Sequence, residues 1–307
     1  MSTKLKATML GKTLEVSCQM CYDGQRKPPA PDADKSAANL FRIVTRAKRQ
    51  VQELASANHW DYFVTVTADP NKIDRTDTRA IQHKWKRYAE YISRKTGSKM
   101  SYLVVPEPHP NGYGFHCHGL AACPDETLVP YLPEDYKKLP MAIKQAYHRA
   151  KSSGRQIYHS LWMDKHVGYN LWEPVQSPER IQNYITKYID KNLVKAAEEA
   201  RRGAAGGSTA QAATGDARRA DLYFHSRGLS HPPQVQLDAD LELQTELMGL
   251  STCVLHEGKT TLKTAAWYGE RVYNGVVVGR TWRVDRENVT PEVWRWLCLR
   301  CHLDSGE

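Results

Sequence analysis

The chain contains no long apolar stretch. None of its 307 residues lies in a run that approaches the ~18 consecutive apolar residues of a membrane-spanning helix. Its first residues, Met1–Lys6, also lack the apolar segment that defines a secretory signal peptide. These two absences lead us to expect a soluble, cytoplasmic protein that has no membrane partner.

Cysteine is also scarce, with 7 residues in the whole chain. Secreted disulfide scaffolds are shorter and richer in cysteine, so that class is excluded. Two Cys-x-x-Cys pairs stand near opposite ends, Cys18 with Cys21 and Cys298 with Cys301. Chain ends often meet in space, and four thiolates are a common ligand set for structural Zn²⁺. These four cysteines are therefore either the ligands of one structural zinc ion or independent reduced thiols.

A nucleotide-binding P-loop is missing as well. That motif needs a glycine five residues before its Gly-Lys-Thr triplet. The two triplets of this chain, which begin at Gly11 and Gly258, have another residue at that place. We therefore expect no fused helicase in this sequence.

Positive charge, by contrast, is in excess. Lys and Arg total 43 against 34 Asp and Glu, which gives a formal net charge of +9 at pH 7. Such an excess favours a polyanionic partner such as nucleic acid, although it says nothing about the fold. Basic residues of two predicted helices are candidates for contacts with a nucleic-acid backbone, and a solvated helix face is the alternative. They are Arg42, Arg46, Lys84 and Arg87.

Helix and strand patterns alternate in the first half of the chain. Apolar residues recur at helical spacing over residues 36–58 and 76–95. Runs rich in β-branched and aromatic residues favour strands at 62–67 and 101–105, and a third strand is expected at 115–122. We expect Pro106 and Pro108 to end the second of these strands.

The connection between the last two strands is short. Asn111-Gly112 is a turn signal, so the strand at 115–122 should return antiparallel to the strand at 101–105. Two helices between and beside such strands are typical of an α+β protein. The sequence therefore predicts an α+β fold in which helices flank a central antiparallel sheet.

Two histidines in the third strand are candidates for a metal site. Residues two apart on a strand project from the same face, so His116 and His118 lie side by side while Phe115 and Cys117 point the other way. Two imidazoles at that separation can bind one divalent ion and leave coordination positions open for a substrate. A structural or surface role is the alternative for the pair.

A third ligand is expected just beyond the preceding strand. The antiparallel return through Asn111-Gly112 would bring Glu107 close to His116 or His118. A carboxylate beside two imidazoles suits Mg²⁺ or Mn²⁺ in phosphoryl chemistry. The alternative for Glu107 is an exposed loop carboxylate.

A predicted helix further along the chain supplies potential nucleophiles. Tyr184 and Tyr188 are four residues apart and share a helix face, and Lys187 and Lys191 repeat the same step. A tyrosine hydroxyl has a pKa of about 10 and is a weak nucleophile. It becomes effective when a metal ion withdraws charge from the phosphate and a lysine stabilises the developing charge. Simple packing of the two rings is the alternative.

Three short motifs in a fixed order carry a family resemblance. They are Phe-Val-Thr-Val-Thr at 63–67, Phe-His-Cys-His-Gly-Leu at 115–120 and Tyr-Ile-Thr-Lys-Tyr-Ile-Asp-Lys at 184–191. This set resembles the HUH endonuclease superfamily, most closely the two-tyrosine rolling-circle replication (Rep) initiators of single-stranded-DNA phages and plasmids. The resemblance implies metal ligands at His116 and His118, with Glu107 at a position that some relatives use, nucleophiles at Tyr184 and Tyr188, and helpers at Lys187 and Lys191.

The resemblance also implies an activity and a fold. Members nick and join single-stranded DNA at a replication origin, which leaves a 5′-phosphotyrosine and a free 3′-hydroxyl, on the HUH, ferredoxin-like sheet. Host helicase and polymerase would be the partners, in the host cytoplasm if a phage carries the gene, and the sequence leaves the oligomeric state open. Two other functions remain open, a non-catalytic origin-binding regulator and a metal-dependent DNA hydrolase for which both tyrosines are dispensable.

The resemblance covers only part of the chain and suggests its division. We expect an irregular N-terminal extension over 1–35 and the nuclease domain over 36–202. A Gly- and Ala-rich flexible insertion follows over 203–220. The C-terminal region over 221–307 is expected to pack its first residues on the nuclease core.

Overall fold

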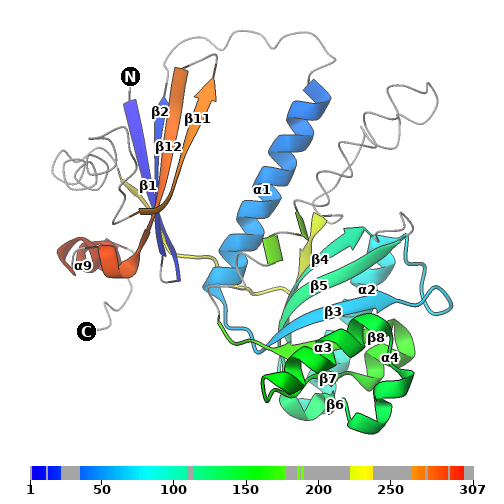
Figure 1. Cartoon of the computed structure of the whole chain (residues 1–307). Coiled ribbons are helices and arrows are strands. Elements are labelled where there is room, and N and C mark those ends of the chain that lie inside the picture. Colours follow the sequence, from blue (N-terminus) through cyan, green and yellow to red (C-terminus); the bar gives the residue numbers. More distant parts are fainter. Residues whose placement is uncertain are drawn as a thin grey trace. The chain divides into compact units, whose positions relative to one another are not determined.

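The chain folds into two compact units (Figure 1). The computed structural model describes residues 2–11, 13–21, 35–108, 114–177, 185–186, 188–189, 222–237, 265–273, 276–289 and 291–300. One unit comprises Ala30–Ser230, and the other joins Met1–Pro29 to His231–Glu307. No helix among these described residues is both long and apolar enough to span a bilayer.

The larger unit, Ala30–Ser230, is built on a 7-stranded antiparallel sheet with strand order β6-β7-β8-β3-β5-β4-β9. Helices flank this sheet, which confirms the predicted α+β fold. The strands are β3 (Tyr62–Ala68), β4 (Ser101–Pro108), β5 (Phe115–Ala122), β6 (Val129–Pro130), β7 (Tyr158–His159), β8 (Gly168–Pro174) and β9 (Phe224–His225). The helices are α1 (Lys35–Ala57), α2 (Thr78–Thr96), α3 (Met141–Ser152) and α4 (Leu161–His166), with short 3₁₀ turns at Asp125–Thr127 and Pro133–Lys138.

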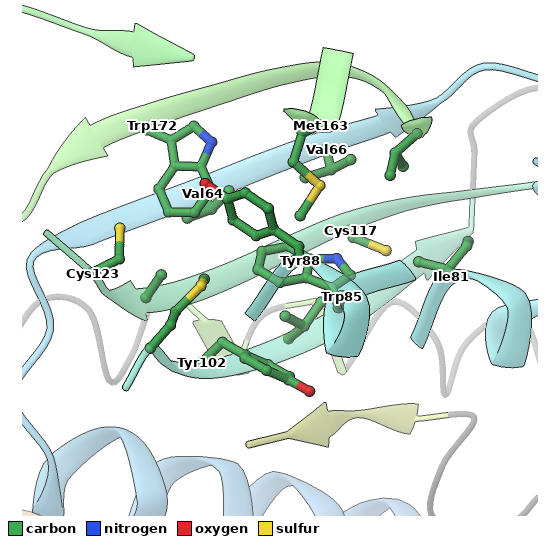
Figure 2. Close-up of a cluster of buried hydrophobic side chains, with 14 of the residues drawn as sticks. Val64, Val66, Ile81, Trp85, Tyr88, Tyr102, Cys117, Cys123, Met163 and Trp172 are labelled. Atoms are coloured by element: carbon green, nitrogen blue, oxygen red, sulfur yellow. The ribbon is translucent and has the colours of Figure 1, made fainter. Parts of the chain in front are cut away.

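Period-two patterning divides the sheet into two faces. Along β3, Val64 and Val66 are buried on one face, while Thr65 and Thr67 are half-buried on the other. The first face packs against α2 and α4 through Trp85, Tyr88, Met163 and other apolar residues (Figure 2). We call the second face, which carries Thr65 and Thr67, the histidine face.

The histidine face is covered by α1. Val44, Val51 and Leu54 of this helix are buried against Leu103 and Leu120 of the sheet. These helix positions follow the i, i+3, i+7 spacing of an amphipathic helix, which the sequence pattern predicted. The helix therefore packs over the same side of the sheet that carries the half-buried polar residues of β3.

Local signals explain the bounds of α2. The carboxylate of Asp77 accepts a hydrogen bond from the backbone N–H of Arg79 at 2.9 Å, which caps the first turn. Gly97 ends the helix with φ 72°, and its N–H donates to the Ser93 carbonyl. Arg94 and Lys95 lie in the last turn, where cations favour the helix dipole.

The prediction that prolines end β4 was wrong. The strand runs through Pro106 to Pro108 and stays paired with β5 as far as Phe115. On its other side β4 pairs with β9 only at Leu103 and Val104. Beyond Val104 it is therefore an edge strand, where a missing N–H on the open side costs no ladder hydrogen bond. The longer strand carries Glu107 into the sheet.

The second unit contains a 5-stranded sheet with order β10-β1-β2-β12-β11. Its strands are β1 (Ser2–Leu10), β2 (Thr13–Cys21), β10 (Gln234–Leu237), β11 (Ala265–Tyr273) and β12 (Val276–Asp285). A 3₁₀ turn at Arg286–Asn288 and helix α9 (Pro291–Arg300) follow. All pairings in this sheet are antiparallel.

The prediction of an irregular segment over residues 1–35 was therefore wrong for its first part. Leu14 and Val16 alternate with Glu15 and Ser17, a strand pattern that the proline-rich stretch after residue 27 obscured. The pair β1–β2 closes into a hairpin at Gly11, whose φ is 59°. β2 then pairs with β12, a partner far along the chain that no local pattern reveals.

Candidate metal and nucleophile site

The strand register aligns four side chains in one row across the histidine face. Thr67 lies opposite His116 on β5 and opposite Tyr169 on β8. His116 in turn lies opposite Glu107 on β4. Cross-strand partners project from the same face of a sheet. The row across β8, β3, β5 and β4 is therefore Tyr169, Thr67, His116 and Glu107.

Each histidine is oriented by a threonine of β3. The Nδ1 atom of His116 lies 3.0 Å from Thr67 Oγ1, and the Nδ1 atom of His118 lies 3.2 Å from Thr65 Oγ1. A hydroxyl can both donate and accept a hydrogen bond, so it supports either imidazole tautomer. These contacts fix the two rings and leave Nε2 as the second nitrogen of each.

The predicted contact between Glu107 and a histidine is present. Nε2 of His118 donates to Glu107 Oε2 at 2.7 Å. The two side chains are only 12% and 11% exposed, so the pair lies largely out of solvent. Low exposure strengthens the electrostatic interaction between an imidazole and a carboxylate. Glu107 is thus a partner of His118 within the sheet, and the exposed-loop alternative is excluded.

Tyr188 completes this cluster from the predicted tyrosine helix. Residues 185, 186, 188 and 189 are helical, and Ile185 and Ile189 are fully buried on the histidine face. The Tyr188 ring stacks on the His118 imidazole with centroids 3.7 Å apart and planes 11° apart. The Phe63 ring packs beside both, with centroids 6.0 Å from His118 and 6.4 Å from Tyr188. The ring that carries the Tyr188 hydroxyl is therefore in direct contact with the His118 imidazole.

The other residues predicted for nucleophilic chemistry lie outside the described part of the chain. They are Tyr184, Lys187 and Lys191. Their roles remain predictions.

Close backbone approach explains the glycine at the start of β8. Gly168 has φ 150°, and a Cβ atom there would lie 2.2 Å from the Thr67 carbonyl oxygen. No larger residue fits without moving the backbone. Gly168 therefore holds β8 against the end of β3 that carries Thr67 and, through it, His116.

The donor chemistry fits a small divalent cation. Mg²⁺ binds its ligands at about 2.1 Å in octahedral geometry, so neighbouring donor atoms lie about 3 Å apart. The 2.7 Å separation between His118 Nε2 and Glu107 Oε2 is close to that value. Among the described residues, however, no three His, Cys, Asp or Glu side chains already form a group that could hold a metal ion. The predicted ligands share a face, and metal binding stays a proposal.

Cys117, between the two histidines, lies on the opposite face and takes no part in the site. It is buried with Val66 and Val104 in the α2 core. Burial raises the pKa of the Cys117 thiol to about 12, so the thiol stays protonated at neutral pH.

The predicted zinc site falls largely outside the described side chains. Cys298 is buried in α9, whereas Cys18 and Cys21 are described only through the backbone of β2. Cys301 is outside the described residues. Structural zinc stays a prediction.

Sequence reasoning misses the supporting residues of this site. It places Thr65 and Thr67 only in a core strand and gives Tyr169 no role. Tyr169 is 51% exposed at the end of the row that contains His116. The available signal is the spacing of Thr65 and Thr67, which matches the spacing of the histidines, but their partnership depends on a register that sequence alone does not fix.

A family comparison identifies the region that contains this site. Residues 61–193 match the family model for replication-associated protein ORF2. A comparison with curated proteins and with solved structures found no significant match. The matched region contains every residue predicted for metal binding and catalysis, from Glu107 to Lys191. The match therefore supports a replication-associated (Rep) family for this part of the chain, with a role in DNA replication.

Proposed function

We propose that this protein nicks and rejoins single-stranded DNA at a replication origin by tyrosine transesterification and so initiates rolling-circle replication. The observation that carries the proposal is the stacking of Tyr188 on His118, whose Nε2 contacts Glu107. A phenol, two imidazoles and a carboxylate on one sheet face are the groups that a two-tyrosine HUH initiator would use. The match to replication-associated proteins supports the same role independently.

In this proposal His116, His118 and Glu107 hold one Mg²⁺ or Mn²⁺ ion. When bound, the ion supplies Lewis-acid stabilisation of charge on the scissile phosphate. Thr65 and Thr67 keep the imidazoles aimed, because each hydroxyl can accept the Nδ1 proton once Nε2 becomes a ligand. Loading the site therefore requires no rearrangement of β3 against β5.

The proposed reaction exchanges one phosphodiester for another. The oxygen of Tyr188 or Tyr184 attacks the phosphorus, and the bond from phosphorus to the 3′-oxygen breaks. The tyrosine proton is lost, and the departing 3′-oxygen takes up a proton to become a free hydroxyl. The 5′ side of the nick is then held as a phosphotyrosine, which conserves the bond for later joining. Lys187 and Lys191 are proposed to stabilise the phenolate and the phosphate charge.

The free 3′-hydroxyl would prime a polymerase of the host. Both triplets that could form a P-loop lack its first glycine, so strand separation is proposed to come from a host helicase. The substrate strand must be single-stranded or extruded from the duplex, because in-line attack needs access to both sides of the phosphate.

A pool of random-sequence single-stranded DNA tests the proposal without knowledge of the origin. The full chain is incubated with the pool and Mn²⁺, denatured, and assayed for DNA that stays with the protein. We expect a covalent adduct that disappears with EDTA and whose sequences share one motif. Cleavage without an adduct would instead indicate a hydrolase, and neither cleavage nor adduct would indicate a DNA-binding regulator.

A further inference from the structure

An aromatic and basic surface lies on the side of the sheet opposite the histidine face. It is formed where α2 packs against α4, and we call it the α2–α4 patch. Its members are Lys84, Arg87, Tyr91, Trp162, Lys165 and His166. The sequence analysis predicted Lys84 and Arg87 as contacts with a nucleic-acid backbone, and the structure places both of them on this face of the sheet.

Three rings of the patch form a row. Tyr91 and Trp162 are stacked with centroids 6.1 Å apart and planes 27° apart. His166 lies one helical turn after Trp162, with its ring centroid 4.4 Å away. All three side chains are partly exposed, and the ammonium of Lys95 lies 6.0 Å from the Tyr91 ring. The row therefore offers flat apolar surface next to positive charge.

Positive charge concentrates at the His166 end. Burial, and then the charges of Lys165, Lys84 and Arg87, lower the pKa of His166 below its usual value. These three cations come from α4 and α2 and are the charged groups that face His166. Their repulsion keeps the imidazole neutral at neutral pH, so His166 adds a ring rather than a further charge.

The patch is held rigid by a buried polar network. The side chain of Asn170 on β8 accepts from the Ser160 N–H at 2.7 Å and donates to Asp164 at 2.8 Å. Asp164 also binds His159, so the carboxylate of α4 is engaged away from the cations. The hydroxyl of Ser160 caps α4. Trp162 and His166 therefore sit on a short helix that is fixed to the sheet.

We propose that the α2–α4 patch is a second binding surface for single-stranded DNA, separate from the proposed nicking site. The proposal goes beyond the proposed function, because binding here needs neither a tyrosine nucleophile nor a metal ion. Sequence-tolerant single-strand binding combines cations that follow the phosphates with aromatic rings that contact bases. Such a surface would hold the strand that extends from the nick.

Charge complementarity favours DNA over an apolar protein partner. The cations of the patch match the regular charge of a phosphate backbone, and neutral rings beside them match the bases. Phosphates placed near Lys84, Arg87 and Lys165 would also offset the field that lowers the pKa of His166. Binding should therefore raise that pKa, and affinity should increase as pH falls through it.

The test measures binding of labelled oligothymidylate to the full chain in EDTA, where no metal-dependent nicking takes place. The patch variant combines Lys84→Glu, Arg87→Glu and Lys165→Glu. The control variant combines Arg79→Glu, Lys86→Glu and Lys151→Glu, which are exposed and change the net charge equally. We expect the patch variant to bind at least tenfold more weakly than the control. Its slope of log affinity against log salt should be smaller by about 2, since about 0.7 is lost per phosphate contact.

Two further measurements test the role of the rings. In high salt, Tyr91→Leu and Trp162→Leu should each weaken binding about tenfold, with folding checked by thermal melting. NMR titration of the His166 imidazole should show a higher pKa in the presence of oligothymidylate. Equal binding by the patch and control variants would overturn the proposal, and so would equally tight binding of polyglutamate at the patch.

Failure of this proposal and failure of the proposed function can be distinguished. A short oligonucleotide that contains the selected nicking motif should form the covalent adduct with the patch variant as well as with the unchanged protein. Loss of oligothymidylate binding in that variant, with the adduct retained, supports a separate surface. If the adduct is lost together with binding in the patch variant, the two surfaces are not separate and the proposal fails.

Discussion

The Tyr188 ring lies flat on the His118 imidazole, with centroids 3.7 Å apart and planes 11° apart. The two residues come from different elements, a helical segment anchored by Ile185 and Ile189 and the central strand β5. The same imidazole contacts Glu107 through its Nε2 atom. One histidine therefore touches both a potential nucleophile and a potential metal ligand, which is the relationship on which the proposed chemistry depends.

Neutralising Glu107 should weaken metal binding without unfolding the protein. Glu107→Gln keeps an oxygen that can accept from His118 Nε2 but removes the charge that attracts a cation. Calorimetric titration with Mn²⁺ should show at least a tenfold loss of affinity, as found for ligand and supporting residues of metal sites. Glu134→Gln, on an exposed residue elsewhere, should bind Mn²⁺ as the unchanged protein does. Equal affinities in all three proteins would remove Glu107 from the site.

Removing the hydroxyl of Thr67 should act on the metal through His116. Thr67→Val keeps the shape of the side chain but loses the 3.0 Å contact with Nδ1. We expect Mn²⁺ affinity to fall about tenfold because the imidazole loses its orientation. Thr67→Ser retains the hydroxyl and should restore binding. A serine variant that binds as poorly as the valine variant would show that packing, not the hydrogen bond, is what matters.

A methyl group at Gly168 should disturb both the fold and the site. Its Cβ would meet the Thr67 carbonyl oxygen at 2.2 Å, so Gly168→Ala should lower the free energy of unfolding by about 3 kcal/mol. Gly97→Ala is the control, because Gly97 also has positive φ but nothing lies within 4 Å of a Cβ there. That change should cost about 1 kcal/mol. Urea unfolding measures both, and similar losses would contradict the close approach.

Tyr169 should contribute to DNA binding by stacking on a base near the metal site. It is 51% exposed and stands at the end of the row that contains Thr67 and His116. Tyr169→Ala should weaken the binding of single-stranded DNA about tenfold, whereas Tyr169→Phe should bind normally. Leu132→Ala removes another exposed apolar side chain and should have no effect. Fluorescence anisotropy in EDTA compares the four proteins, and a normal alanine variant would exclude this role.

Much of the site could be predicted because its signals are local. Spacing of two placed His116 and His118 on one strand face, and a turn signal placed Glu107 beside them. Spacing in the tyrosine motif likewise predicted a helix, and Ile185 and Ile189 are buried as an amphipathic helix requires.

The parts that escaped prediction depend on long-range pairing. The partnership of Thr67 with His116 and Tyr169 requires the register of three strands, which no single segment determines. β4 continues past Pro106 only because β9 is short and leaves an open edge. β1 and β2 find their sheet through β12, almost the whole chain away.

Mass spectrometry of the covalent adduct tests the central claim most directly. The unchanged protein, Tyr188→Phe and Tyr184→Phe are each incubated with Mn²⁺ and the selected oligonucleotide, and the adduct is digested to peptides. Phenylalanine keeps the ring that stacks on His118, so a loss of reaction reports the missing hydroxyl rather than a disturbed core. We predict a nucleotide attached through phosphate to Tyr188 in the unchanged protein and none at that position in Tyr188→Phe. Full cleavage by the variant that lacks both hydroxyls would contradict the account.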